Sequence, residues 1–153
     1  MKFEAQFNHK PENRKLTYSA QDYSFGMEPS VGELDFEIAL NHLCLTVVNK
    51  QIVDLDGFCV YGEWIKSDYE VPKAKLGILK ILDDLQPGFS YGLNKEDWPI
   101  YVNVKTEWVC IGDPEHKGEA VEFIKNCIAV IDDKNLVSLW LKPESLPQEI
   151  LQN

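Results

Sequence analysis

Short apolar segments recur along most of the chain, and turn residues separate them. Phe36, Ile38 and Leu40 alternate with polar residues, a period of two that is typical of half-buried strands. About eight to ten such segments follow one another at the spacing of sandwiches and barrels. No long helical pattern lies between them, which argues against parallel βαβ units. The sequence therefore predicts a mostly β fold, an antiparallel sandwich or strongly bent barrel, with a short C-terminal helix in "ESLPQEILQ".

The length of 153 residues suits one compact domain. We expect a single β-rich domain over residues 1–153, in which residues 1–33 form an irregular N-terminal segment. Within that segment, "FEAQF" and "KLTYSA" are candidates for short strands, because apolar residues alternate in the first and β-formers are frequent in the second. "FGMEPSVGE" is rich in turn residues and is expected to be a loop.

Residues 119–128 are open to two interpretations. Ala120, Phe123 and Ile124 fit helical spacing. The segment is also rich in β-branched residues, and the turn "DDKN" follows it before a further strand pattern. A hairpin is the favoured interpretation, and a helix is the alternative.

The chain is strongly acidic, with 25 acidic and 15 basic side chains and a formal net charge of −10. Such a field repels phosphate backbones and anionic membrane surfaces, so neither nucleic acid nor a membrane is an expected partner. It attracts and steers a basic protein. Acidity also serves solubility alone, and this interpretation stays open.

The compartment is expected to be cytoplasmic. The stretch "MKFEAQFNHKPENRK" has no apolar core of the kind that signal peptides carry, and no apolar run approaches the roughly 20 residues of a membrane span. The cysteines lie in apolar surroundings, without a CxxC pair, and we expect them to be reduced core residues rather than a disulfide or a metal cluster. They are Cys44, Cys59, Cys110 and Cys127.

The window "IVDLDGFCVYGE" resembles the end of an EF-hand loop in its spacing of acids around a turn glycine. Its first ligand position is Ile52, and its flanks are β-patterned instead of helical. We therefore expect a strand with a bulge or turn at Gly57. Alternation then places Asp54 and Asp56 on one solvent-facing side, together with Ile52.

A hydrolase that uses strand carboxylates is an alternative function. Asp54 and Asp56 are two residues apart, close enough for acid–base chemistry, and Glu37 is a further strand acid. His42 and Cys44 share a strand face but supply too few ligands for zinc. Because the chain also lacks GxSxG, Walker and GxGxxG motifs, no cofactor and no metal are expected.

An acidic segment and neighbouring aromatic residues are the predicted partner-binding site. Between residues 107 and 122 five acids face a single lysine, Lys117. Tryptophan and tyrosine in acidic loops are candidate anchors for a protein partner. The alternative is that these aromatic residues are partly buried core residues, as is common in a small β domain. The candidate residues are Trp64, Tyr69, Trp98, Glu107, Asp113, Glu115, Glu119 and Glu122.

The sequence favours a non-enzymatic, acidic cytosolic protein that binds a basic protein. In size, acidity and β content it is like the small bacterial immunity proteins that neutralise a basic toxin domain, an analogy of class and not of motif. Besides the hydrolase, a β domain that binds a small molecule in an aromatic-lined cleft is an alternative.

Overall fold

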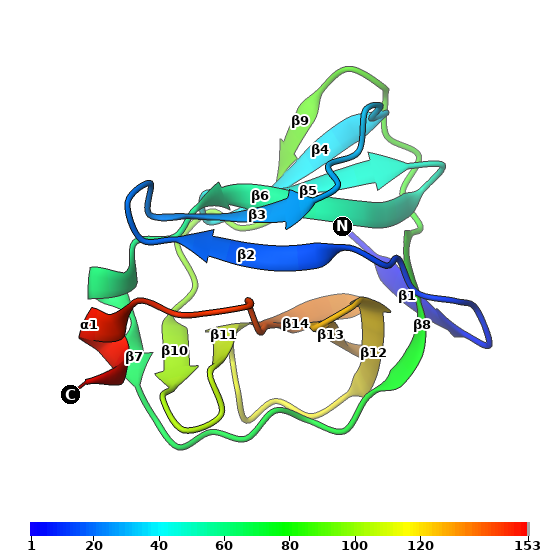
Figure 1. Ribbon diagram of the computed structural model, residues 1–153. Helices are drawn as coiled ribbons and strands as arrows, with labels where there is room; N and C mark the ends of the chain where they lie inside the picture. The colour runs from blue at the N-terminus through cyan, green and yellow to red at the C-terminus, as the bar shows by residue number, and fades with distance from the viewer. Residues whose placement is uncertain (153) are drawn as a thin grey trace.

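The computed structural model describes residues 1–152 and consists of one large curled sheet that forms a half-barrel (Figure 1). The mostly β prediction, the strongly bent sheet and the short C-terminal helix are confirmed. The strands are β1 (Phe3–Phe7), β2 (Lys15–Ser19), β3 (Ser24–Glu28), β4 (Phe36–Leu40), β5 (Leu43–Val48), β6 (Gln51–Phe58), β7 (Ile65–Lys66), β8 (Lys75–Ile81), β9 (Ser90–Gly92), β10 (Ile100–Asn103), β11 (Trp108–Gly112), β12 (Glu119–Ile124), β13 (Cys127–Asp132) and β14 (Asn135–Leu141). A 3-10 turn, η1 (Tyr61–Glu63), and a helix, α1 (Gln148–Leu151), complete the elements.

The strands follow the order β7-β10-β11-β14-β13-β12-β8-β6-β5-β4-β9. Outside this path, β1 pairs with β8, and β3 pairs with both β2 and β6. Most pairs are antiparallel, whereas β7–β10, β8–β12 and β4–β9 are parallel. Strand β8 lies inside this path and joins its two parts, because it pairs with β12 near its start and with β6 through Lys80 and Gln51.

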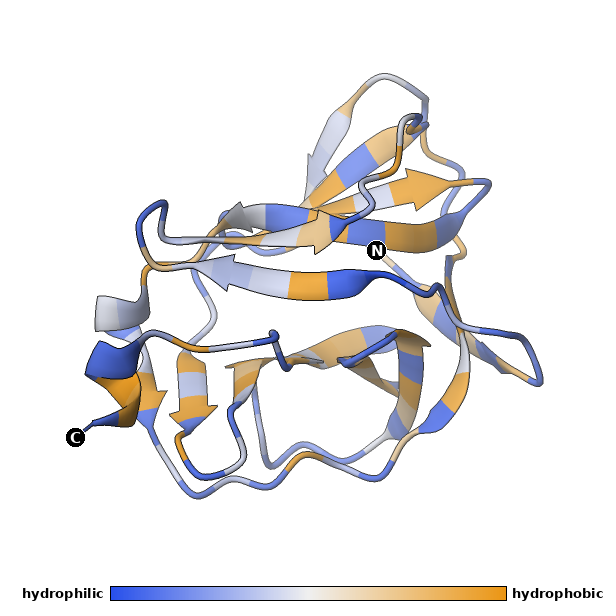
Figure 2. Ribbon diagram, viewed as in Figure 1, coloured by the Kyte–Doolittle hydropathy of each residue, from blue (hydrophilic) through white to orange (hydrophobic). Residues whose placement is uncertain are grey.

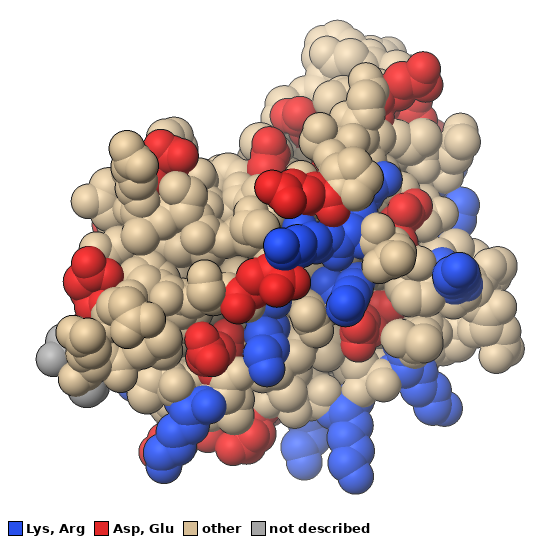
Figure 3. All heavy atoms as spheres, viewed as in Figure 1, with Lys and Arg blue, Asp and Glu red and all other residues tan. Residues whose placement is uncertain are grey.

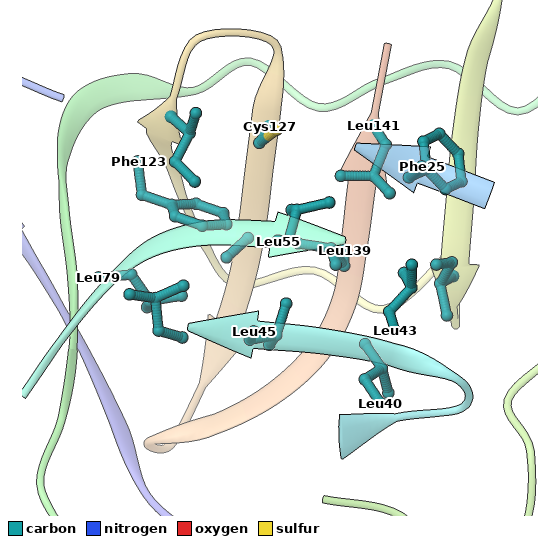
Figure 4. Packing of buried hydrophobic residues seen from close by; sticks show 14 of the residues in the cluster. Phe25, Leu40, Leu43, Leu45, Leu55, Leu79, Phe123, Cys127, Leu139 and Leu141 are labelled. Atoms are coloured by element: carbon teal, nitrogen blue, oxygen red, sulfur yellow. The ribbon is translucent and has the colours of Figure 1, made fainter. Parts of the chain in front are cut away.

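The core lies between the two ends of the curled sheet. Figure 4 shows Leu45 and Leu55 on one side, opposite Phe123 and Leu139 on the other. These four side chains are at most 1% exposed. Apolar and polar residues alternate along strands such as β4 (Figure 2), which turn one row of side chains inward and one row outward. Burial of this inner row is what closes the half-barrel. Strand β13 is buried on both faces, because Ile128 and Val130 belong to a second apolar cluster with Cys110 and Trp140.

Residues 119–128 form a hairpin of β12 and β13, as the favoured interpretation predicted. The turn is at Lys125 and Asn126, and Asn126 has a φ of 64°. The helical spacing in this segment arises because Val121, Phe123 and Ile124 are all buried around a register shift in β12.

The first 33 residues contain β1 and β2, which match the candidate strands "FEAQF" and "KLTYSA", and a further strand, β3, that was not expected. Strand β3 begins at Ser24 and covers the first four residues of the segment that was expected to be a loop, so that expectation is wrong for residues 25–28. Its signal is weak because only Phe25 and Met27 point inward, and Gly26 lies between them. Pairing with β2 and β6 stabilises a stretch whose own propensity is low.

Neither helical element in residues 1–152 has the length and apolar character that a membrane crossing requires. All four cysteines are free thiols. Cys59, Cys110 and Cys127 are buried in the core, as expected, whereas Cys44 is half-buried and belongs to neither core cluster, so the prediction of a core residue is wrong for it.

Candidate functional site

The excess of negative over positive charge comes from two segments of the chain. Residues 22–63 and 82–97 contain twelve of the 25 acidic side chains and two of the 15 basic ones, Lys50 and Lys95, so they carry the whole net charge of −10. The charges of the remaining 13 acidic and 13 basic side chains cancel, and we call the rest of the chain the neutral half. The first set comprises β3 to β6, η1, β9 and their connections, and we call it the acidic half. In Figure 3 basic residues lie over the centre, right and bottom with acidic residues among them, whereas the top of the view, around β4 and β9, shows acidic residues and no basic ones.

The outer surface of the acidic half is a five-stranded face without a basic residue. The described strands β3, β6, β5, β4 and β9 contain no Lys or Arg. Strand register places Thr46 between Glu37 of β4 and Asp54 of β6, and Cys44 beside Asp56. We call these five side chains the acidic row. They bring three carboxylates from two strands onto one surface.

A bulge in β6 determines which residues join this surface. The pairing of β5 with β6 shifts between Thr46 and Val47, and this leaves Val53 without a partner in that ladder. The side chains of Ile52 and Leu55 are both fully buried as a result. The expectation that Ile52 shares a face with Asp54 and Asp56 is therefore wrong.

Asp54 is also more buried than the sequence indicated, at 8% exposure. Its Oδ2 accepts a hydrogen bond of 3.0 Å from the backbone N–H of Val31. Asp56 is exposed, in agreement with the expectation of a solvent-facing strand acid. The two carboxylates thus have different environments although they are two residues apart.

The carboxylates of the acidic row raise the pKa of their neighbours. Partial burial, followed by repulsion from Asp54 and Glu37, raises the pKa of the Asp56 carboxyl. Burial, followed by Glu37 and Asp56, raises the pKa of the Cys44 thiol. Each of these shifts disfavours further negative charge on the surface around Asp56 and Cys44. One basic side chain from outside the acidic half does reach it: the guanidinium of Arg14 donates to the carbonyls of Val53 and Pro29.

At one end of this face lies a small pocket beside an exposed phenylalanine. Phe58 is 62% exposed, although a phenyl ring is ordinarily buried. The pocket has a volume of about 150 Å³, and Phe58, Val60 and His42 lie in its wall. Glu63 and Asp97 supply carboxylates to it. No Lys or Arg is among its lining residues in the part of the chain that the structure describes.

A pair of asparagines holds the pocket's two distant segments together. The side chain of Asn41, in the β4–β5 turn, accepts from Asn94 Nδ2 and the Trp98 backbone N–H, and donates to the Trp98 carbonyl. Asn94 Oδ1 in turn accepts from the Asn41 backbone N–H. This clasp places Asp97 next to the turn, where its Oδ2 lies 4.0 Å from His42 Nε2.

The predicted anchor Trp64 is not on the surface. It is 8% exposed and stacks on Phe25 with ring centroids 6.0 Å apart, while Tyr18 packs edge-on at 5.1 Å. A partner cannot reach this indole, so its proposed role as a contact anchor is corrected. Trp64 is buried because aromatic residues of β2 and β3 pack on it. The sequence next to Trp64 does not show that these two strands lie there.

Four other predicted residues gather around the loop of residues 113–118. Trp98 and Asp113 line a groove of about 440 Å³, and Glu115 lines an adjoining groove of about 550 Å³. The Tyr69 hydroxyl donates to Glu115 Oε1 over 3.0 Å. Lys73, His116 and Lys117 line the second groove as well, so the acids there have cationic neighbours.

The last three predicted acids are spread along the same part of the fold. Glu107 lies at a turn position with a φ of 67°, between β10 and β11. Glu119 is exposed in β12. Glu122 accepts a hydrogen bond from the Asn126 backbone N–H and lies close to Lys125 in a groove at the edge of the sheet. These acids do not converge on one surface.

Sequence reasoning placed the acidic site at residues 107–122 and missed the acidic half. The signal was present, because residues 22–63 contain eight acids and only Lys50. Charge counted over one continuous stretch of sequence does not reveal that residues 82–97 lie beside this segment, because the β4–β9 pairing brings the two together only in the fold.

No protein-family model matches the chain, and no curated protein matches it. Within residues 1–152, no three His, Cys, Asp or Glu side chains are grouped so that they could hold a metal ion.

Proposed function

We propose that this protein binds a basic protein partner through the outer surface of its acidic half. The observation that supports this proposal is the location of the whole net charge of −10 in that half. A separated charge of this size attracts a cationic protein from a distance and orients it before contact. The second support is the exposed Phe58, because binding surfaces combine a few apolar anchors with a charged rim.

Neutralisation of a basic toxin domain in the cytoplasm is the biological role that we propose for this binding. Such a role needs no catalytic residues and depends on fast, tight association, which complementary charge favours. It rests on the same class analogy of size, acidity and β content. A neighbouring gene for a large protein with a basic C-terminal domain would supply the natural partner for the test.

The test compares two double variants with the same change in charge. Glu37→Gln with Asp56→Asn removes two charges from the acidic row, and Glu115→Gln with Glu119→Gln removes two from the neutral half. The readout is the association rate with lysozyme and with cytochrome c at low ionic strength. We expect the first double variant to slow association roughly threefold or more, and the second to have little effect. Negligible binding of every basic protein, or equal effects of the two variants, would contradict the proposal.

A second candidate function is the binding of a small molecule in the two grooves beside residues 113–118. Their volumes, about 440 and 550 Å³, are within the range of small-molecule sites. Trp98 and Tyr101 line the first groove, and Pro72 and Trp140 line the second. A metabolite library tested by thermal shift would support this function if Trp98→Ala removed the shift that a bound compound produces.

A further inference from the structure

The pocket beside Phe58 has an apolar floor and two apolar side chains at its mouth. The floor includes Leu43 and Ile111, which are at most 1% exposed, and Cys59, which is 4% exposed. At the mouth, Phe58 and Val60 are 62% and 40% exposed. A partner side chain that fills the pocket therefore meets apolar atoms at its tip and at its base, and it covers apolar surface that water now contacts.

The polar groups around the pocket leave its floor uncharged. Both polar atoms of the Asn41 side chain already have hydrogen-bond partners in the clasp with Asn94 and Trp98. The carboxylates of Glu63 and Asp97 belong to exposed residues at the rim. A cationic head group that entered the pocket would lose its water on an apolar floor without gaining a partner, whereas an aliphatic side chain gains from the same burial. The floor therefore favours an aliphatic occupant.

The size of the pocket restricts the occupant further. Its volume of about 150 Å³ is below the roughly 300 Å³ at which sites for small-molecule ligands begin. It corresponds to about five waters at ~30 Å³ each. One aliphatic side chain of the size of leucine fills such a space, whereas the indole of tryptophan is too large for it.

Backbone contacts form the pocket before a partner arrives. Gly57 has a φ of 129°, and a Cβ at this position would collide with the carbonyl oxygen of His42. The β4–β5 turn therefore packs directly on the end of β6 and forms one side of the pocket, while the asparagine clasp brings Asp97 to the other. The walls belong to paired strands and a hydrogen-bonded loop, so little reorganisation is needed to receive a side chain.

We propose that this pocket receives a leucine-sized aliphatic side chain that the basic partner presents between cationic residues. The aliphatic group packs on Leu43 and Ile111, and the flanking cations stay in solvent, where Glu63 and Asp97 attract them separately. Charge complementarity selects this partner, because the acidic half carries the net charge of −10 and a second copy of the chain would bring the same charge against it. This inference rests on the proposed binding of a basic protein and identifies the anchor that the site recognises.

The experiment uses the whole chain, labelled with ¹⁵N, and three capped peptides that differ at one position. Each peptide has lysines on both sides of a central leucine, alanine or tryptophan, and amide chemical shifts follow binding at low ionic strength. We expect the leucine peptide to bind about fivefold more tightly than the alanine peptide, because only leucine fills the pocket. The tryptophan peptide should lose this gain, and the largest shifts should be at Asn41, Phe58 and Val60.

Two matched pairs of variants separate the apolar contact from the charge. Phe58→Ala is compared with Phe89→Ala, since the two rings are 62% and 57% exposed and only Phe58 lines the pocket. Phe58→Ala should reduce the preference for leucine over alanine to less than about twofold, and Phe89→Ala should keep it. Asp97→Asn is compared with Glu96→Gln, since both are exposed acids of one loop and only Asp97 lines the pocket. Asp97→Asn should weaken all three peptides about two- to threefold, more than Glu96→Gln does, and keep the preference for leucine.

The outcomes separate this inference from the proposed function. If the leucine and alanine peptides bind equally, if Phe58→Ala keeps the preference, or if the shifts centre elsewhere, the aliphatic pocket is wrong. It is also wrong if the free chain dimerises through these residues. If lysozyme and cytochrome c still bind in those cases, the proposed function stands, and if neither the peptides nor the basic proteins bind at low ionic strength, both fail. Because all four substituted side chains are exposed, circular dichroism should show an unchanged fold.

Discussion

At the scale of single residues, the acidic row shows how neighbours decide the state of a carboxylate. Asp54 is buried and has a backbone N–H as its hydrogen-bond partner, whereas Asp56 is exposed and its nearest charged neighbours are other acids. A pKa that is raised on folding means that the folded state holds its proton more tightly than the unfolded state. The ionised form of Asp56 therefore costs the folded protein stability at neutral pH.

Asp56→Asn is expected to stabilise the protein at neutral pH. The raised pKa of Asp56 gives stability that is fully present below the ordinary carboxyl pKa and is lost as pH rises through the folded value. Because the side chain is exposed, the gain in unfolding free energy should be below about 1 kcal/mol. Urea unfolding at several pH values measures it, and the gain should fade toward pH ~4.

Glu119→Gln is the control for this substitution, because Glu119 is also an exposed strand acid but lies in the neutral half. A thiol readout is independent of unfolding: the loss of the Asp56 charge lowers the pKa of Cys44 and should speed its alkylation about two- to fivefold. Burial raises the pKa of Cys59 to about 12, so this thiol should stay unreactive in the folded chain. An unchanged Cys44 rate would show that the carboxylates do not act on this surface as described.

At the scale of an element, the bulge in β6 controls the orientation of the residues around it. The carbonyl of Val53 lies at the bulge and accepts a hydrogen bond of 2.8 Å from Arg14 Nε. The same guanidinium donates through Nη1 to the Pro29 carbonyl over 2.6 Å. Arg14 therefore fixes the bulge and the connection after β3 with one planar group, a geometry that lysine cannot reproduce.

Arg14→Lys keeps the positive charge and removes the forked pair of donors. We expect a loss of unfolding free energy of about 1–3 kcal/mol, because a partly buried carbonyl loses a charged donor. Chemical denaturation of the variant measures this loss. Lys15→Ala is the control, since Lys15 is exposed and its removal should change stability by less than about 0.5 kcal/mol. A tolerated Arg14→Lys would mean that the bulge holds without this residue.

The bulge also marks the limit of what alternation can predict. The period of two correctly gave Phe36, Ile38 and Leu40 as an inward row, because β4 pairs without a shift. In β6 one extra residue reversed the faces after Ile52, and no residue in "IVDLD" announces it. The burial of Trp64 has a similar cause, since its partners come from β2 and β3. Contacts between distant segments decide both cases.

At the scale of the whole molecule, the sheet separates charge as well as closing the core. The acidic half contains six of the eight large apolar side chains that are exposed, Phe58 and Phe89 among them. Its strands β4 and β6 bring Glu37, Asp54 and Asp56 onto one surface, and residues 22–63 and 82–97 contain only two basic residues against twelve acids. Self-repulsion within this half opposes folding, and salt screens that repulsion.

Added salt is therefore expected to raise the melting temperature. Between about 20 mM and about 500 mM NaCl the Debye length falls several-fold, which screens the exposed acids from one another. The rise should be smaller in the double variant Glu37→Gln with Asp56→Asn than in Glu115→Gln with Glu119→Gln. Differential scanning fluorimetry measures all three chains, and equal slopes would contradict the location of the repulsion in the acidic row.

The separation of charge gives the molecule a permanent electric dipole, directed between its two halves. A cationic support would then adsorb the chain in one preferred orientation, with the outer face of β4, β5 and β6 against the support. The grooves beside residues 113–118 belong to the neutral half and would remain accessible to solutes. Adsorbed protein would lose its capacity for basic proteins and keep any capacity for small molecules. Binding measurements on the adsorbed protein would thus show which function belongs to the acidic half and which to the neutral half.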